Sequence, residues 1–246
     1  MILLLQYTLI FASVLMLVAL GGCFAERSGV INIGLEGIMV IGALGGALVM
    51  KFLPVSVGAF AMVSLTVLAS VLFGMIFSLL LAVAAIQFKA DQTITGTAMN
   101  MLATAGATVA VKAMNTAASG GNDVSSDIVY TQAKDLFVVR LGNFEFNWFM
   151  VLALVCLVVS YVALYKTRFG LRLRACGEHP QAADSVGINV YKMRYAGVLI
   201  SGLLGGLGGI VYITAGVSLW KFENGVAGFG FLALAVMIFG AWHPLK

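Results

Sequence analysis

The fold is decided by the stretch VSVGAFAMVSLTVLASVLFGMIFSLLLAVAAI, residues 55–86, which carries no charged side chain in 32 positions. A helix needs about 20 consecutive apolar residues to cross the hydrocarbon core of a bilayer. The stretch is therefore long enough to span a membrane and too long for one straight span. It predicts either a long tilted helix or a spanning helix with an interfacial extension.

Outward from this stretch, the composition of the whole chain is that of a membrane protein. Hydrophobic residues make up 61% of the 246 positions, charged residues only 10%, and the mean hydropathy is +1.06. A soluble domain has about 25% charged residues, because it needs a charged surface to stay dispersed. This composition excludes a soluble enzyme, a disordered chain, a disulfide scaffold and a nucleic-acid binder.

Further apolar runs predict the other membrane segments. They lie at about 2–20, 30–50, 93–115, 148–165, 195–219 and 226–242. We therefore predict an all-α fold, a polytopic integral membrane helix bundle of about seven segments that forms a single domain over residues 1–246. Glycine pairs four residues apart, such as Gly42 and Gly46 or Gly202 and Gly206, predict close helix packing in lipid.

Two polar stretches predict the orientation. Residues 166–194 carry six basic and two acidic side chains, which places them in the cytoplasm by the positive-inside rule. Alternation of the spans then places the loop at about 116–147 and residues 218–225 outside the cell, and residues 87–92 inside. The N-terminus is external if every run spans the membrane.

The first polar constellation lies at residues 26–37, ERSGVINIGLEG, between two very apolar runs. Ser28, Asn32 and Glu36 are four residues apart, so a helix would place them on one face. Ionisable groups at membrane depth indicate a functional site, and the dense glycine indicates a broken or bent helix beside a cavity or inside protein. The alternative is structural: Glu26 and Arg27 form an ion pair, and Glu36 caps a neighbouring helix.

The second constellation is a polar stripe that begins at Thr93. Its members follow helical spacing: Thr93, Thr97, Asn100, Thr104 and Thr108. A polar stripe on a spanning helix is typical of a water-filled path for a hydroxyl-rich solute. Alternatively, the threonine hydroxyls bond to the carbonyl four residues earlier, and Asn100 bonds to a neighbouring helix.

The third constellation is the polar loop at residues 174–189. Pro180 suits the first turn of a helix and Gly187 suits a stop, so residues 178–186 predict a short helix. Such a helix in a basic loop is either a docking element for a partner or a solvated connector. His179 stands alone, far in sequence from His243, and makes no metal site. The sequence has no GxxxxGK[S/T] phosphate loop, so any ATP would be bound by another chain.

Four stretches resemble the membrane permeases of ABC importers that take up branched-chain amino acids and simple sugars. They are ERSGVINIGLEGIMVIGALGGA (26–47), DQTITGTAMNMLA (91–103), RACGEHPQAADSVGINVYKMRYAGVLISGLLGGLGGIVY (174–212) and GFGFLALAVMIFGAWHPL (228–245). The match runs in order along nearly the whole chain. The branch it resembles most is the nucleoside-type permeases that work with a lipoprotein receptor related to basic membrane lipoproteins.

The resemblance implies a permease subunit of the bacterial cytoplasmic membrane. Its partners would be an ATPase subunit that binds the ATP, a second permease, identical or different, and an external substrate-binding lipoprotein. The loop resembles the family's coupling helix, which sits in a groove of the ATPase; its residues here are Arg174, Glu178, Pro180, Ala182, Ala183, Asp184 and Gly187. Residues near the translocation path would be Asn32, Glu36, Thr93, Thr97, Asn100 and Thr104.

The resemblance also sets limits and leaves rivals. Family members continue for two or so membrane segments after GFGFLALAVMIFG (228–240), so we expect this chain to lack the family's last helices. Simple sugars and branched-chain amino acids are alternative substrates. An ion-coupled secondary transporter that uses Glu26, Glu36 or Asp91 is a rival. An intramembrane enzyme is disfavoured, because neither histidine lies near a cluster of catalytic groups.

Overall fold

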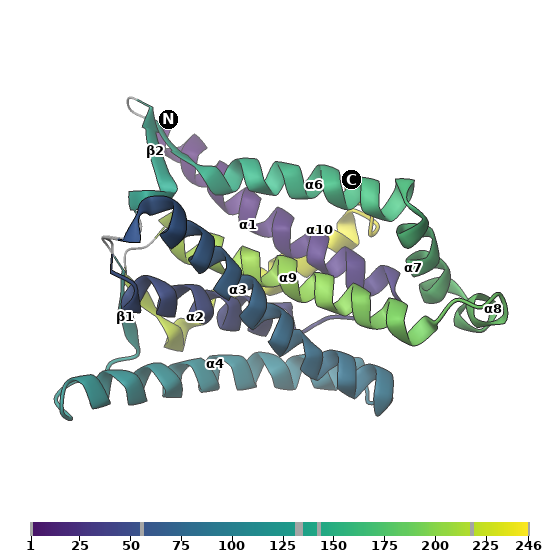
Figure 1. Ribbon diagram of the computed structural model, residues 1–246, viewed down its shortest axis with the longest axis horizontal. Coiled ribbons are helices and arrows are strands. Elements are labelled where there is room, and N and C mark those ends of the chain that lie inside the picture. Colours follow the sequence, from purple (N-terminus) through teal and green to yellow (C-terminus); the bar gives the residue numbers. More distant parts are fainter. Residues whose placement is uncertain (1, 55–56, 131–134, 142–143, 217–218, 246) are drawn as a thin grey trace.

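The computed structural model describes residues 2–54, 57–130, 135–141, 144–216 and 219–245. These residues form a bundle of long helices, with two small antiparallel sheets at one end (Figure 1). The long helices are α1 (Ile2–Arg27), α2 (Leu35–Phe52), α3 (Ala59–Ala82), α4 (Gln92–Ala118), α6 (Trp148–Lys166) and α9 (Val190–Gly216). The shorter ones are α7 (Arg168–Glu178), α8 (Pro180–Ser185) and α10 (Phe229–Phe239). Among the described residues, seven candidate membrane spans are long and apolar enough to cross a bilayer, which is the number predicted.

Within the long uncharged run at 55–86, residues 59–86 belong to one continuous helical element. Helix α3 passes at its C-terminal end into a π-helical turn, η2 (Val83–Gln87), so that the candidate span covers 29 residues. At about 1.5 Å per residue this is longer than the hydrocarbon core is thick, which requires tilt or an end outside the core. The first predicted run, 2–20, was too short: α1 continues to Arg27.

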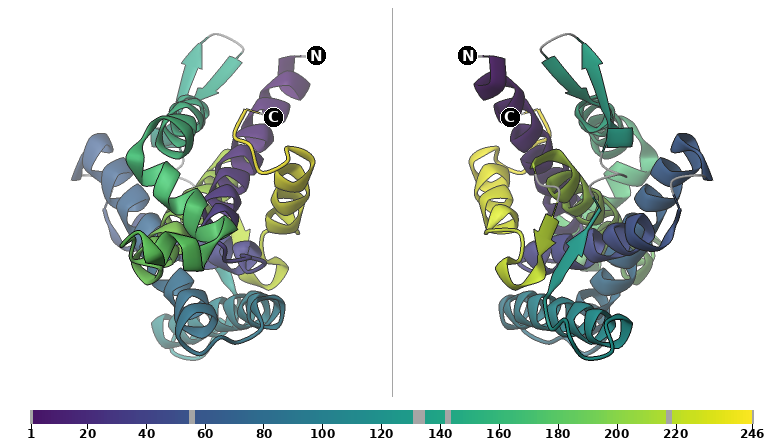
Figure 2. Two further views of the ribbon diagram at one scale, coloured as in Figure 1. Left: turned by 90° about the vertical axis from the view of Figure 1, so that its right-hand side faces the viewer. Right: turned by 90° about the vertical axis from the view of Figure 1, so that its left-hand side faces the viewer.

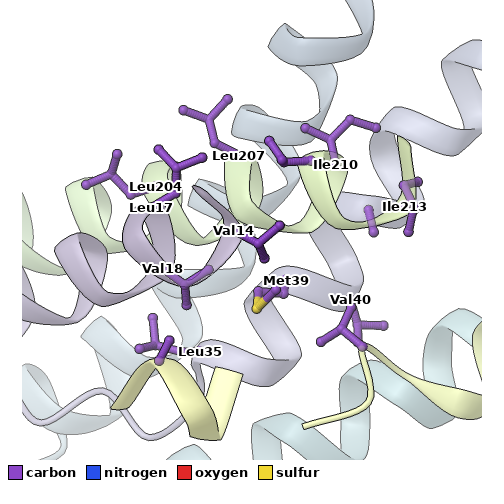
Figure 3. Packing of buried hydrophobic residues seen from close by; sticks show 14 of the residues in the cluster. Val14, Leu17, Val18, Leu35, Met39, Val40, Leu204, Leu207, Ile210 and Ile213 are labelled. Atoms are coloured by element: carbon purple, nitrogen blue, oxygen red, sulfur yellow. The ribbon is translucent and has the colours of Figure 1, made fainter. Parts of the chain in front are cut away.

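The centre of the bundle is built from α1, α2, α3 and α9. Helix α9 packs against the other three, and the apolar side chains that fill the space between α1, α2 and α9 are fully or almost fully buried (Figure 3). Glycines allow the close approach that the sequence predicted: a Cβ atom on Gly42 would lie 2.5 Å from the Cα atom of Gly206. A side chain at this position would hold the two helix backbones apart.

Helices α4, α6 and α10 lie at the outside of the bundle. Figure 2 shows them on three different sides of the central helices. About a third of each candidate span that contains them is buried, compared with two thirds or more of the spans in α1, α2 and α9. The peripheral helices therefore leave much of their surface for lipid or for other subunits.

The loops gather at two opposite ends of the bundle. At one end, which we call the α8 end, residues 28–34 lie against α7 and the loop before α4. At the other, the β1 end, strand β1 (Asp127–Val129) pairs with β4 (Leu219–Lys221), with Asp127 opposite Lys221. The second hairpin joins β2 (Val138–Leu141) and β3 (Phe144–Asn147). The loop predicted at 116–147 includes residues 131–134 and 142–143, which lie outside the described residues.

This grouping matches the alternation predicted from the sequence. Residues 87–92 and 166–194 share the α8 end, and the described parts of 116–147 share the β1 end with residues 219–225. Which end faces the cytoplasm stays a prediction from the basic residues. One local prediction is wrong. Residues 28–34 form turns and extended chain, so Ser28, Asn32 and Glu36 do not lie on one helical face.

Candidate functional site

The break between α1 and α2 is the most polar part of the bundle interior. Ser28, at its start, donates from Oγ to the carbonyl of Ala25 (2.6 Å), and Gly29 adopts a φ of +85° that favours glycine. Asn32 is fully buried and donates from Nδ2 to Oγ of Ser201 on α9 (2.8 Å). Its Oδ1 has no hydrogen-bond partner among the described residues. The break is thus inside protein, as the dense glycine predicted.

Glu36, in the first turn of α2, holds the start of α10. Its two carboxylate oxygens accept the backbone N–H groups of Gly228 (2.8 Å) and Gly230 (2.6 Å), and its side chain is buried. These donors belong to the N-terminal turn of α10, where backbone N–H groups have no partner within the helix and the helix dipole favours an anion. Glu36 therefore caps a neighbouring helix, which is the structural alternative that the sequence offered for it.

Asn100 fastens α4 to the same break. Its Oδ1 accepts the N–H of Gly37 (2.8 Å), and its Nδ2 donates to the carbonyl of Ile33 (3.0 Å). At the start of α4, Gln92 accepts the N–H of Ile31 through Oε1 (2.6 Å). The side chain of Asn100 satisfies backbone groups that the break leaves without helical partners. The structure thus brings Asn32, Glu36 and Asn100 into one region of the bundle.

The threonines of the α4 stripe are spread along the helix and bond to its own backbone. Thr97 donates to the carbonyl of Thr93 (3.0 Å), Thr104 to that of Asn100 (3.2 Å) and Thr108 to that of Thr104 (2.8 Å). These are the i−4 bonds of the structural alternative. Thr93 and Thr97 are exposed, and Thr104 is half-buried at the edge of the packed face. The threonines therefore lie on or beside the open side of α4, and Thr104 lies beside Gly225, which also adjoins Glu36.

The loop at 166–194 folds into two helices at the α8 end. Pro180 is the first residue of α8, and Gly187 ends the element with a φ of +80°, both as predicted. Ala183 is buried, whereas Ala182 and Asp184 are exposed. A cavity of about 440 Å³ lies between α8, the start of α9 and the loop before α4. Its lining includes Pro180, Gln181 and Asp184 together with the basic residues Lys89 and Arg194.

Two other residues of the loop face the bundle. The guanidinium of Arg174 lies over the ring of Tyr165, 4.6 Å from its centroid. The Glu178 carboxylate lies 3.8 Å from Nη1 of Arg27, at the end of α1. The sequence offered Glu26 as the partner of Arg27, but the ion pair that the structure gives Arg27 joins it to Glu178.

The contacts of Arg27 with the end of α10 were missed in the sequence. Its Nε donates to the carbonyl of Trp242 (3.2 Å), and its Nη2 lies within hydrogen-bond distance of the carbonyl of Ala241 (3.4 Å) and the hydroxyl of Tyr165 (3.3 Å). Residues 27 and 242 are 215 positions apart, and no local pattern joins them.

The comparisons with known proteins decide the family. A family profile described as the permease component of the branched-chain amino acid transport system matches residues 4–246. The chain belongs to this permease family. Over 97% of its length it is 46% identical to the guanosine ABC transporter permease NupQ of Bacillus subtilis strain 168. Over 96% it is 40% identical to the nucleoside ABC transporter permease NupC of Lactococcus lactis subsp. cremoris. It covers 75% of the length of each relative.

A more distant relative carries another substrate in its name. The chain is 32% identical over 99% of its length to a putative glucose ABC transporter permease, TsgC13, of Haloferax volcanii, of which it covers 72%. No solved structure matches the chain significantly. As a member of the permease family, the chain is a multi-pass membrane subunit of an ABC importer, a transporter subunit whose ATP is bound by a partner.

Proposed function

We propose that this chain is the permease subunit of an ATP-driven importer of nucleosides. The observation that carries the proposal is its 46% identity to a guanosine permease along almost its whole length. The 40% identity to a nucleoside permease from another genus supports the same substrate class. In this proposal the ATPase binds at the α8 end, an external lipoprotein delivers the nucleoside at the β1 end, and a second permease completes the membrane part.

The loop at residues 174–189 is the docking element for the ATPase in this proposal. Helix α8 is short and lies at the extreme of the bundle, with Asp184 exposed and Ala183 anchored in the protein. A helix held on one side and open on the other suits a groove in a partner. Asp184 and the cavity beside it offer both charges for that contact, because Lys89 and Arg194 line the same cavity.

The translocation path in this proposal runs along the open face of α4. Helix α4 is the least apolar of the candidate spans, although only about a third of it is buried. Thr93 and Thr97 lie on its exposed side, beside exposed apolar side chains such as Ile94, so this face mixes hydroxyl and apolar groups. We assign Asn32, Glu36 and Asn100 to the wall of the path, where they fix the backbone that shapes it.

Reconstituted transport tests the proposal. The chain is placed in proteoliposomes with its ATPase, second permease and lipoprotein, and uptake of labelled guanosine is measured with and without ATP. We expect ATP-dependent uptake that uridine or adenosine reduces by competition and that ribose and leucine leave unchanged. Competition by ribose or leucine would move the substrate to sugars or amino acids. Uptake driven by a pH gradient in vesicles without the ATPase would establish the secondary transporter instead.

Docking has its own test within this system. The double variant Glu178→Lys and Asp184→Lys reverses two charges of the loop. We expect it to weaken co-purification of the ATPase and to lower uptake. Unchanged binding and uptake would refute the docking role of the loop.

A further inference from the structure

The structure joins the proposed docking loop to the residues after α10 through Arg27, beside a contact through Tyr165, whose ring meets Arg174 of the loop and lies 4.6 Å from the ring of His243. The guanidinium, at the end of α1, contacts three other parts of the chain at the α8 end: it donates to Tyr165 of α6, pairs with Glu178 of α7 and reaches the carbonyls that follow α10. Its side chain is mostly buried, with 26% of its surface exposed. A guanidinium has five donors in a rigid fork, which suits it to several acceptors at once.

The backbone after α10 turns back on the end of the helix at the place where Arg27 meets it. Ala241 and Trp242 both have left-handed backbone, with φ of +50° and +54°. Left-handed residues are a common way to end a helix, and here the N–H of Trp242 donates to the carbonyl of Met237 (3.1 Å). Here they aim the two carbonyls at Arg27, at the helix end where the dipole favours a cation.

Helix α10 is held by opposite charges at its two ends. Glu36 accepts the N–H groups at its start, and Arg27 donates to the carbonyls beyond its end. These two residues flank the break between α1 and α2. An 11-residue helix is about 16 Å long, so α10 behaves as one rigid element that is hydrogen-bonded to both sides of the break.

The docking loop reaches the same guanidinium by two routes. Glu178 pairs with Arg27 directly, and Arg174 lies over the ring of Tyr165, whose hydroxyl Arg27 contacts. The C-terminal part of α7 also presses on the break: a Cβ atom on Gly177 would lie 3.1 Å from the nitrogen of Gly29. A displacement of α7 and α8 must therefore alter the surroundings of Arg27.

We propose that Arg27 is the positioning residue that transmits movement of the ATPase-docking loop to α10, and through α10 and Glu36 to the break that shapes the translocation path. This inference rests on the proposed function of the loop. Arg27 contacts neither ATP nor nucleoside in it. It makes α10 follow the docking loop, so that the nucleotide state of the ATPase changes the opening of the path.

Three variants separate transmission from docking and from folding. Arg27→Gln removes the charge and most donors, Arg27→Lys keeps the charge without the fork, and Tyr165→Phe removes a single contact. Arg168→Gln is the matched control, because Arg168 is exposed at the start of α7 and loses the same charge. We expect all four proteins to co-purify with the ATPase. We expect nucleoside imported per ATP hydrolysed to fall about tenfold in Arg27→Gln, a typical coupling between two sites, and less in the other two. The control should match the original protein.

A distance measurement separates this inference from the proposed function. Spin labels are placed on Phe239, at the exposed end of α10, and on Ile76, on the exposed side of α3, in a chain whose cysteines are replaced. In the assembled complex we expect ATP to change their separation, and Arg27→Gln to abolish the change. A response that persists in Arg27→Gln, or is absent from the original protein, overturns the inference. Failure of nucleoside import with the response intact overturns the proposed function alone.

Discussion

Replacing Glu36 tests whether a buried carboxylate holds α10 in place. Glu36→Gln keeps the size of the side chain and one acceptor oxygen, but turns an NH₂ group toward the second backbone donor. Glu36→Ala removes both acceptors. In either variant fewer acceptors remain for the N–H groups of Gly228 and Gly230. These groups lie in a buried part of the bundle, since the Glu36 that they contact is only 8% exposed.

The magnitude follows from the two hydrogen bonds. A buried donor left without a partner costs about 1–3 kcal/mol, and a bond to a charged group is worth about 1 kcal/mol more than one to a neutral group. Glu36→Gln loses one partner and the charge of the other, so we expect the free energy of unfolding to fall by about 2–4 kcal/mol. Glu36→Ala loses both partners, so we expect a fall of about 2–6 kcal/mol, toward the upper end because a cavity also forms.

Reversible unfolding in mixed detergent micelles, followed by circular dichroism while the denaturing detergent is titrated, measures these differences. The control is Glu178→Gln, because Glu178 is 68% exposed and its pair with Arg27 is long at 3.8 Å. Exposed ion pairs contribute less than about 1 kcal/mol, so the control should unfold almost as the original protein does. If Glu36→Gln and Glu36→Ala unfold no more easily than the control, Glu36 is not a cap and our reasoning about α10 is wrong.

Three further predictions use other parts of the bundle. Gly42→Ala should lower the free energy of unfolding by about 1–3 kcal/mol, because the new Cβ would meet the backbone of Gly206. Gly106 faces open space, so Gly106→Ala should leave the free energy of unfolding unchanged or raise it by up to about 1 kcal/mol. Equal effects of the two substitutions in the same titration would contradict the packing. Burial raises the pKa of the Cys176 thiol, so fewer thiolates form near neutral pH. Maleimide should therefore label Cys176 only after denaturation, as measured by mass spectrometry. Rapid labelling of Cys176 in the folded protein would show that the thiol is accessible. Asn115→Ala should release the loop at residues 119–127, which its side chain holds through carbonyls of that loop, and limited proteolysis should then cut there sooner; an unchanged cleavage rate would argue against this anchor.

The helices could be predicted from the sequence because a bilayer imposes its own rule on each segment. Backbone groups in hydrocarbon must be bonded within the segment, so an uncharged run such as 55–86 has one solution, a helix. The ends were harder. Helix α1 runs on through Glu26 and Arg27 because these side chains meet protein at the α8 end instead of lipid. A hydropathy pattern assumes lipid around every residue and cannot register that difference.

The roles of the polar residues depended on partners that are remote in the sequence. Glu36 was correctly singled out as a buried charge, and one of its two interpretations was a cap. The sequence does not indicate which helix Glu36 caps, because Glu36 and Gly228 are 192 positions apart. The helical stripe of Ser28, Asn32 and Glu36 failed for the same reason: tertiary bonds from Asn100 and Ser201 stabilise an open chain at 28–34 that local spacing reads as helix.

The charges beside the α1–α2 break also explain how the short helix α10 can end inside the bundle. A helix that stops within a membrane exposes backbone groups at high cost unless something replaces the missing turn. Here an anion meets the start of α10 and a cation meets the residues beyond its end, so each end of α10 faces a side chain of the favourable sign. Because Arg27 and Glu36 stand on the two sides of the connection at residues 28–34, moving that connection must move α10, and moving α10 must strain it. A rigid scaffold could have used longer, self-contained helices. A short helix tied to a break in this way is suited to a subunit whose interior has to change shape.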